Sequence, residues 1–353
     1  MPEQTYRVIQ WATGKVGQVA IRHFAASPAF ELVGVLVTNR AKVGKDAGEI
    51  AGIAPTGVLA TDNVEAIVAL NADCVHYAPL IQDLDVICRL LRSGKNVVTP
   101  MGPFYPTEWS RADIERIEAA CADGGTSFHG SGIHPGFAGD LLPLTLARLA
   151  SRIDRIRVYE IADFVKHPTK YIEFMGFGRK PDDWMAKPSR SPEAVQYFAQ
   201  NMAMVAERLG KKINKLTTDI ELAAATRDIR YPTGVIPSGT VAGQHYAWTA
   251  WVEDTPLIEF HMFWVMGREH MEPIWDCGES GYRVAIDGEP PAELVLRGGR
   301  LPDGTYSYPG LEWTALAGVN VIPDVCDARP GLITHLDLGV ARLRGQVHAR
   351  GVS

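Results

Sequence analysis

The chain has 353 residues, of which 46% are hydrophobic, and its formal net charge at pH 7 is -6. This length exceeds what one small hydrophobic core needs and favours two domains. The acidic balance, without any long run of Lys or Arg, argues against a nucleic-acid or membrane-surface partner, so we expect a small diffusible one. The five cysteines include no C-x-x-C pair, which argues against a disulfide framework and against a structural zinc site.

The first residues do not have the pattern of an export signal. The segment "MPEQTYRVIQW" runs directly into a strand-like pattern, without the charged and apolar regions of a signal peptide. No stretch of the sequence approaches the ~20 apolar residues of a membrane-spanning helix. We therefore expect a cytoplasmic protein that does not contact membranes.

The first part of the chain alternates short apolar runs with helical patterns. Strand-like runs lie at 6–11, 30–37, 72–78 and 96–99, and helical patterns begin near Gly17 and occupy 63–70, 83–94 and 111–125. Strands that alternate with helices at this spacing are typical of a parallel sheet covered on both faces. The fold class is therefore α/β, with a Rossmann-type doubly wound sheet that we place at residues 1–150.

The pattern changes in the second half, where the segments become longer. Strand-like runs at 156–164, 216–229, 238–254 and 256–267 accompany one long helical pattern at 192–210. They predict an α+β domain with a mostly antiparallel sheet, which we place at residues 151–310. A Pro- and Gly-rich segment at 287–310 is typical of hairpins, and a helical stretch at 311–328 precedes a polar tail.

The junction between the first strand and the first helix reads "ATGKVG". In a doubly wound sheet this turn needs glycines for a tight bend, for close approach of the backbone to a pyrophosphate, and for packing of the helix. The second and third glycines are present and Ala replaces the first, which predicts a dinucleotide turn; an ordinary glycine-bearing turn is the alternative. The cofactor-binding residues predicted here are Ala12, Thr13, Gly14, Lys15, Val16 and Gly17.

The end of the second strand distinguishes the two nicotinamide cofactors. An acid at this place usually holds a free ribose 2'-hydroxyl, but the sequence has Thr38, Asn39 and Arg40, with Lys42 close by. A cationic site without an acid suits a 2'-phosphate, because Arg offers paired donors to phosphate oxygens. We therefore favour NADP over NAD. The alternative is that these residues are solvated loop charges, which applies most to Lys45.

Several further stretches resemble the dihydrodipicolinate reductase-like oxidoreductases, and more closely the branch of 2,4-diaminopentanoate dehydrogenase and the native amine dehydrogenases. The stretches are "VHYAP" at 75–79, "GKNVVT" at 94–99 with "YP" at 105–106, "GSGIHPGFAGDLLPL" at 130–144 and "NVIPDVCDARPG" at 320–331. The resemblance covers most of the first domain and the C-terminal segment. It implies that the segment 311–353 returns to complete the first domain.

The resemblance also implies the position of the nicotinamide half of the cofactor. Tyr77, Ala78 and Pro79 would lie beside it, where open sheets bind ligands at the carboxyl ends of their strands. Within the other matching stretches, the residues expected to bind the cofactor are Thr99, Gly132 and Asn320. The segment "GIHPGF" would form the crossing between the domains near the reacting carbon.

One departure from that branch concerns a glutamate. The amine-dehydrogenase pattern has this acid between the Thr of "VVT" and the following "YP", where it is expected to activate ammonia. This chain has Met101 and Gly102 at the matching positions. Sugar oxidoreductases of similar plan have a Lys-Pro pair after the corresponding strand, and Thr99-Pro100 cannot act as that general acid.

Three residues are candidates for the catalytic proton transfer. Hydride transfer itself is the work of the cofactor, so the protein must position the substrate and manage one proton. His134 lies in the predicted interdomain crossing and can titrate near neutral pH. Tyr105 and Glu160 are the other candidates, while Asp163, three residues after Glu160, faces the opposite side of a regular strand. A histidine hydrogen-bonded in a turn and a packed tyrosine are the structural alternatives.

The second domain is rich in aromatic residues, which are Tyr246, Trp248, Trp251, Phe260, Phe263 and Trp264. If they reach the substrate, the substrate is bulky and apolar; packing in the core and in a subunit interface is the other use, and we expect a homodimer formed through this domain. No spacing of His, Cys and acidic residues predicts a metal site. The sequence thus predicts an NADP-dependent oxidoreductase that transfers hydride reversibly to a C=N or C=O carbon. A ketone or conjugated-substrate reductase using Tyr105 or His134 as acid, and an NADP-binding regulator without activity, remain open.

Overall fold

The computed structural model describes residues 4–166, 171–186 and 192–339. It divides into two compact units, unit 1 with residues 1–137 and 310–353, and unit 2 with residues 138–309. The first boundary precedes helix α6 (Leu141–Ala147), which packs on strands of unit 2, whereas the sequence interpretation puts it after this helix. The polar tail expected at the C-terminus lies outside the described residues.

Unit 1 is built on a seven-stranded sheet in which every neighbouring pair is parallel. The strand order is β16-β6-β5-β4-β1-β2-β3. The strands are β1 (Tyr6–Trp11), β2 (Phe30–Leu36), β3 (Ala60–Thr61), β4 (Cys74–Tyr77), β5 (Asn96–Thr99), β6 (Ser127–Gly130) and β16 (Gly331–Ile333). The helices are α1 (Lys15–Ala26), η1 (Arg40–Lys42), α2 (Ala47–Ala51), α3 (Val64–Ala69), α4 (Leu84–Arg92), α5 (Arg111–Gly124), α10 (Gly310–Val319), α11 (Ile322–Cys326) and α12 (His335–Leu338). The segment η2 (Ile133–Phe137) is a turn with non-helical backbone angles at its three central residues.

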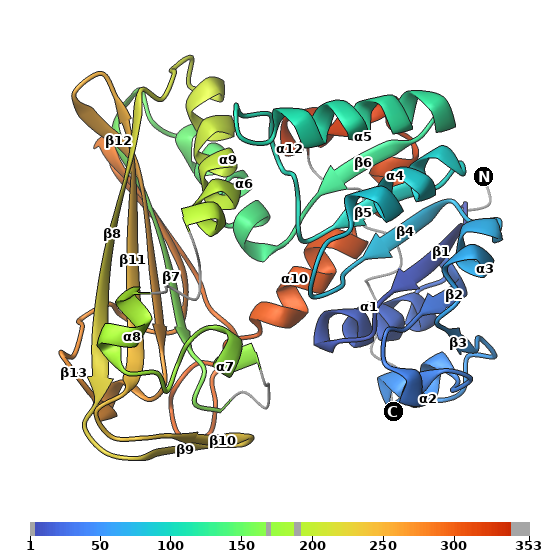
Figure 1. The fold of residues 1–353 in the computed structure, drawn as a ribbon. Coiled ribbons are helices and arrows are strands. Elements are labelled where there is room, and N and C mark those ends of the chain that lie inside the picture. The colour runs from blue at the N-terminus through green and yellow to red at the C-terminus, as the bar shows by residue number, and fades with distance from the viewer. Residues whose placement is uncertain (1–3, 167–170, 187–191, 340–353) are drawn as a thin grey trace, which may run out of the picture. The chain divides into compact units, whose positions relative to one another are not determined.

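Helices lie on both faces of this sheet (Figure 1). Hydrophobic side chains of the strands hold them there. Successive strand residues alternate between the faces: Ile9 and Val75 pack with α3, α4 and α5, whereas Val8 and Cys74 pack with α1, α10 and α11. A sheet covered on both faces is the doubly wound architecture predicted from the alternating pattern, so the predicted fold class is confirmed.

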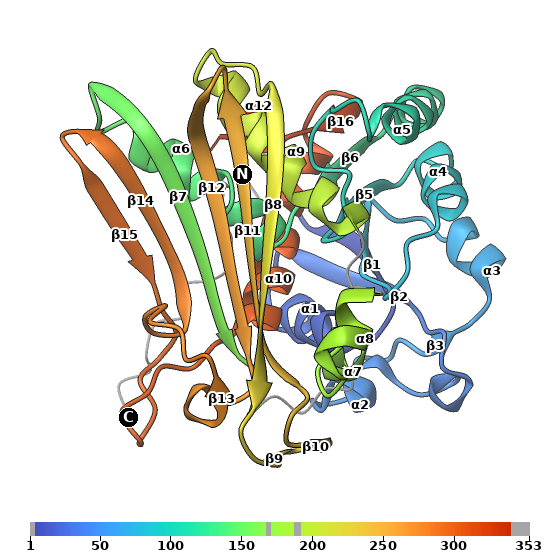
Figure 2. The same ribbon diagram turned by 60° about the vertical axis from the view of Figure 1, so that its left-hand side comes forward.

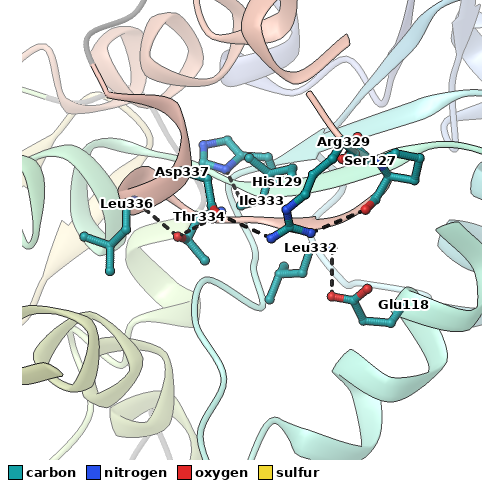
Figure 3. A network of polar contacts seen from close by, with 10 residues as sticks. Glu118, Ser127, His129, Arg329, Leu332, Ile333, Thr334, Leu336 and Asp337 are labelled. Carbon is teal, nitrogen blue, oxygen red and sulfur yellow. Dashed lines mark hydrogen bonds and ion pairs between the residues drawn. The ribbon is translucent and has the colours of Figure 1, made fainter. Parts of the chain in front are cut away.

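The segment after α11 adds one more strand to the edge of the sheet. β16 pairs with β6, and side chains fix it there (Figure 3). The Leu332 amide donates to Glu118 Oε1 at 3.0 Å, His129 Nδ1 lies 2.7 Å from the Ile333 carbonyl oxygen, and the Ser127 hydroxyl donates to the carbonyl of Arg329 at 2.8 Å. A capping box between Thr334 and Asp337 then begins α12.

Unit 2 contains a second seven-stranded sheet, in the order β13-β8-β11-β12-β7-β14-β15 (Figure 2). All its neighbouring strands are antiparallel except β7 and β12, so the prediction of a mostly antiparallel sheet is confirmed. The strands of unit 2 are β7 (Arg152–Asp163), β8 (Lys215–Ala225), β9 (Ile229–Tyr231), β10 (Gly234–Ile236), β11 (Val241–Val252), β12 (Thr255–Val265), β13 (Met271–Glu272), β14 (Gly281–Glu289) and β15 (Ala292–Leu296). Its other helices are α7 (Tyr171–Phe174), α8 (Pro181–Ala186), α9 (Pro192–Arg208) and η3 (Arg268–His270).

The aromatic residues of unit 2 are largely core residues. Tyr246, Trp248 and Phe260 are each 2% exposed or less and belong to one cluster with Trp184 and Phe198. Trp248 stacks on Phe198 of α9, with ring centroids 4.5 Å apart. These side chains therefore hold α9 to the sheet and give no argument for a bulky apolar substrate.

Candidate functional site

The candidate cofactor site lies at the carboxyl edge of the unit 1 sheet. β1 lies between β2 and β4 in the sheet, and the chain continues from β1 to β2 toward one edge and from β4 to β5 toward the other. The place between β1 and β4 is therefore the switch point, where open sheets bind ligands. Trp11 pairs with Tyr77, and Thr99 pairs with Gly130. The predicted residues that follow these strand ends are thus gathered at one edge.

The turn between β1 and α1 is tight because Gly17 lies close to the backbone of Ala12. A Cβ on Gly17 would lie 2.1 Å from the Ala12 carbonyl oxygen, so only glycine permits this approach of helix to strand. A Cβ on Gly14 would meet nothing within 4 Å. Ala12, at the first motif position, has φ of 70°, the left-handed conformation that glycine adopts more readily.

The start of α1 fits an anion. The first helical hydrogen bond is donated by Gln18 to the Gly14 carbonyl, so the amides of residues 15–17 have no acceptor among the described residues. The N-cap, Gly14, has no side chain to occupy them, and the first turn contains no acid. Open space above Gly14 and unsatisfied amides below it are what a pyrophosphate requires.

Lys42, which follows β2 in the chain, is hydrogen-bonded to this turn. Lys42 Nζ donates to the Thr13 carbonyl at 2.9 Å and lies 3.1 Å from the Thr13 hydroxyl, and burial lowers its pKa. Lys45 instead forms an exposed ion pair with Glu49 at 2.6 Å. Of the two lysines, only Lys42 therefore contacts the glycine turn.

The end of β2 carries the three residues predicted to meet the adenine ribose. Thr38, Asn39 and Arg40 are exposed, and the Asn39 side chain accepts a hydrogen bond from the Ala41 amide to begin η1. The Arg40 guanidinium forms no hydrogen bond or ion pair with the residues that the structure describes. Its donors are therefore available for a ligand.

The predicted nicotinamide residues are firmly held. The Tyr77 hydroxyl accepts a hydrogen bond from the Asp83 amide at 3.1 Å, its ring lies 5.3 Å from that of Trp11, and burial raises its pKa. The Ala78 amide donates to Trp11, and Thr99 Oγ1 accepts from the Met101 amide. The other predicted residues lie nearby in the chain (Pro79), in the loop after β6 (Gly132) and just after α10 (Asn320).

The proton-transfer candidates are divided between the units. His134 is half-buried in η2, and Tyr105 is 7% exposed with its carbonyl accepting from Ser110 Oγ. Both belong to unit 1, whereas Glu160 belongs to unit 2. Asp163 accepts from the amides of Val165 and Gly267, so it supports a turn.

Glu160 is the centre of a buried polar group that the sequence did not predict. It is 6% exposed, and its Oε1 accepts from Trp264 Nε1 at 2.9 Å and from the Tyr308 hydroxyl at 3.0 Å. The Tyr282 and Tyr308 hydroxyls lie 2.7 Å apart. Because Tyr308 gives its hydrogen to Glu160, Tyr282 donates to Tyr308. Burial and then the Glu160 charge raise the pKa of both tyrosines, which keeps them protonated.

Of the two positions that match the missing glutamate, Gly102 is sterically restricted. Gly102 has φ of 76°, and a Cβ there would lie 2.8 Å from the Phe104 ring. A glutamate at 102 would therefore strain the backbone and displace Phe104. Among the described residues, no group of three or more His, Cys, Asp or Glu side chains could hold a metal ion, and no helix has the length and hydrophobicity to cross a membrane.

Comparison with known proteins assigns the family. The profile of the 2,4-diaminopentanoate dehydrogenase C-terminal domain matches residues 137–349, and that of the dihydrodipicolinate reductase N-terminus matches residues 8–78. An amine dehydrogenase of Streptomyces virginiae is 32% identical over 94% of this chain and 95% of its own. The 2,4-diaminopentanoate dehydrogenase of Acetoanaerobium sticklandii is 25% identical over 67% of this chain and 64% of its own.

The fold also matches a solved structure, the amine dehydrogenase from Mycobacterium smegmatis, with a TM-score of 0.80 at 22% identity over 97% of this chain and 98% of that one. The chain belongs to the 2,4-diaminopentanoate dehydrogenase family, which confirms the resemblance seen in the sequence. It is an oxidoreductase with a Rossmann-type domain, which implies a nicotinamide cofactor and a small-molecule substrate.

Proposed function

We propose that this member of the 2,4-diaminopentanoate dehydrogenase family uses NADP and transfers hydride reversibly to a C=N or C=O carbon. The observation that supports this most directly is the end of β2, where Arg40 has no partner among the described residues and no acid follows the strand. A carboxylate there would repel a 2'-phosphate, whereas a guanidinium donates to it in pairs.

In this proposal the cofactor lies along the carboxyl edge of unit 1. Thr38, Asn39 and Arg40 hold the 2'-phosphate, and the turn from Ala12 to Gly17 holds the pyrophosphate. The residues beside the nicotinamide are Tyr77, Ala78, Pro79, Thr99, Gly132 and Asn320. When bound, the cofactor supplies the hydride, and the protein positions the substrate and handles the proton.

A titration with NADPH and NADH at fixed low salt tests the cofactor assignment. We expect NADPH to bind more tightly than NADH, and Arg40→Ala to weaken NADPH binding by about tenfold or more, as loss of a charge-assisted hydrogen bond requires, while NADH binding stays unchanged. Lys45→Ala is the matched control, because Lys45 is paired with Glu49 in the same loop. If neither dinucleotide binds, the proposal is wrong; if NADH binds more tightly, the preference for NADP is wrong.

For the proton we propose Glu160, with His134 and Tyr105 as the candidates in unit 1. Support for Glu160 comes from its burial and from two neutral donors on one oxygen, which orient the carboxylate. Glu160→Gln, His134→Gln and Tyr105→Phe are compared by kcat and by NADPH affinity. We expect the variant that removes the proton-transfer group to lose turnover by about a hundredfold while it still binds NADPH.

A specific observation favours a second candidate, a ketone or conjugated-substrate reductase. Neither Met101 nor Gly102 supplies the carboxylate of the amine-dehydrogenase pattern, and at Gly102 the Phe104 ring lies where a side chain would begin. Ketone reduction with NADPH that does not require ammonia would support this candidate; turnover only with ammonia would support the amine-forming reaction. NADPH binding without turnover of any carbonyl or imine would favour the remaining alternative, an NADP-binding regulator without activity.

A further inference from the structure

The two peptide groups that precede α1 are each held by a side chain. The Ala12 carbonyl accepts from Gln10 Nε2 at 2.9 Å, and the Thr13 carbonyl accepts from Lys42 Nζ at 2.9 Å. In a planar trans peptide the N–H points opposite to the C=O. Gln10 therefore sets the direction of the Thr13 N–H. Lys42, with a longer hydrogen bond from Gln18 Nε2 to the same carbonyl at 3.3 Å, sets that of the Gly14 N–H. Neither amide donates to a described residue.

Gln10 is itself oriented by a buried histidine on the next strand. Its Nε2 also donates to the Trp11 carbonyl at 3.0 Å, so the two carbonyls identify the nitrogen end of the amide. The oxygen end then faces His76, whose Nδ1 lies 2.8 Å from Oε1 and must carry the proton. Burial lowers the pKa of His76 to about 4, so this ring stays neutral at pH 7.

Glycines on both sides leave room for this buried pair. The Cβ that Gly17 lacks would lie 3.0 Å from Gln10 Nε2, and the Cβ that Gly318 lacks would lie 3.2 Å from His76 Nε2. Gln10 and His76 are both 0% exposed, so a buried polar pair has been kept where apolar residues would pack. The Gln10 side chain donates to the Trp11 and Ala12 carbonyls, where β1 ends and the turn begins, and accepts from His76.

We propose that Gln10, oriented by His76, and Lys42 are positioning residues for the dinucleotide: they aim the Thr13 and Gly14 amides at the pyrophosphate. Neither Gln10 nor Lys42 needs to touch the pyrophosphate for that role. The inference rests on the proposed function, since it requires that a dinucleotide binds at this turn. The inference goes beyond the proposed function because it assigns part of the dinucleotide affinity to residues that lie underneath the turn.

The test compares two ligands, NADPH and adenosine 2'-monophosphate, which carries the 2'-phosphate but no pyrophosphate. Gln10→Met removes the donor at nearly constant volume, and Lys42→Met does the same from the loop after β2. We expect each variant to weaken NADPH binding by about tenfold or more. In isothermal titration calorimetry, Gln10→Met should leave binding of adenosine 2'-monophosphate within about twofold, and Lys42→Met should weaken that binding less than it weakens NADPH binding. Lys42→Met keeps the test decisive if Gln10→Met does not fold.

Two matched lysines serve as controls. Lys45→Met removes an exposed lysine of the same loop, and Lys95→Met removes a buried one, 2% exposed, that donates to the Val68 carbonyl away from the turn. Both controls should bind NADPH like the wild type. Unchanged NADPH affinity in Gln10→Met and Lys42→Met overturns the inference, and so does an equal loss for both ligands, which would mean direct phosphate contact or general damage. Failure of the wild type to bind NADPH refutes the proposed function instead.

Discussion

At the scale of single residues, the two motif glycines do different work. Gly17 gives room for the Ala12 carbonyl, whereas Gly14 faces open space where a ligand would lie. Gly14 has φ of -66°, so alanine fits its backbone without strain. Gly17 is therefore required by the fold, whereas Gly14 is required only by the dinucleotide that we propose.

This difference predicts opposite behaviour of two alanine variants. Gly14→Ala should keep the stability of the protein, or raise it by about 0.5 kcal/mol through the unfolded chain, and weaken NADPH binding. Gly17→Ala should lower stability by about 2 kcal/mol or more, because its Cβ would meet backbone that cannot yield. Urea unfolding and NADPH titration of both variants provide the check. Equal stability of the two variants would contradict the assignment.

Some residues of the candidate site can be predicted from the sequence, and others only from the fold. The glycine spacing and the absence of an acid after β2 are local signals, and both are read without knowing the fold. Gln10 and His76 lie 66 positions apart, and only the pairing of β1 with β4 brings them together. The signal in the sequence that could have indicated this pair is one polar residue in each of two otherwise apolar strands. The hydrogen bond between Tyr308 and Glu160 joins residues 148 positions apart, so this buried group left no pattern to recognise.

At the scale of elements, β16 depends on contacts from outside its own ladder. It has three residues, and the Leu332 amide on its outer edge donates to Glu118 of α5 (Figure 3). Such a short apolar run gives no sequence signal for a strand, which explains why it was not predicted. The single helical stretch expected at 311–328 likewise divides into α10 and α11, with Pro323 in the first turn of α11.

Glu118→Ala should therefore loosen the edge strand. The substitution leaves the buried Leu332 amide without its acceptor, which we expect to lower the free energy of unfolding by about 1–2 kcal/mol. Glu115→Ala, an exposed glutamate on the same helix, is the control and should have an effect below about 0.5 kcal/mol. Thermal unfolding measures the loss, and hydrogen exchange of residues 331–333 locates it. Unchanged exchange in the Glu118 variant would show that β16 does not depend on this contact.

At the scale of the whole molecule, two buried histidines predict how stability depends on pH. Burial lowers the pKa of His76 to about 4 and, as the largest cause, that of His129 to about 3, from an ordinary value of 6.5. The unfolded chain therefore takes up protons below pH 6.5 that the folded protein does not. The stabilisation is complete above pH 6.5 and is lost as the pH falls through the window from 6.5 to about 4 and 3.

We expect each histidine to contribute about 2 kcal/mol to the difference in stability between pH 7 and pH 5, because one pKa unit corresponds to about 1.4 kcal/mol. Urea unfolding at the two pH values measures the difference. His76→Gln should reduce it by about half, since an amide does not titrate, while His245→Gln, a half-buried histidine of unit 2, should reduce it less. A stability that is constant over this range would contradict neutral burial of the two rings.

The predicted homodimer requires a surface that a second copy can cover, and unit 2 offers the sheet face opposite α9. On this face His245 stacks on Phe263 with centroids 4.0 Å apart, and Tyr159 stacks on His261 at 4.9 Å. Arg283 lies over the Tyr159 ring at 3.9 Å. A flat face with aromatic and histidine rings and paired charges matches the composition of subunit interfaces.

His245 and His261 join these stacks, with ring centroids 5.5 Å apart, and Ala247 lies beside them on β11, opposite His261 of β12. Ala247→Arg would place a long side chain on this face, opposite His261 of β12 and Asp219 of β8, and its bulk would keep a second copy from covering the face. We expect it to convert a dimer, with twice the chain mass of 38.6 kDa, into a monomer in light scattering after gel filtration. Glu207→Arg introduces the same side chain at an exposed position of α9 and should leave the dimer intact. A wild-type mass of 38.6 kDa would refute the dimer, whereas a dimer that survives Ala247→Arg would place the interface on another surface.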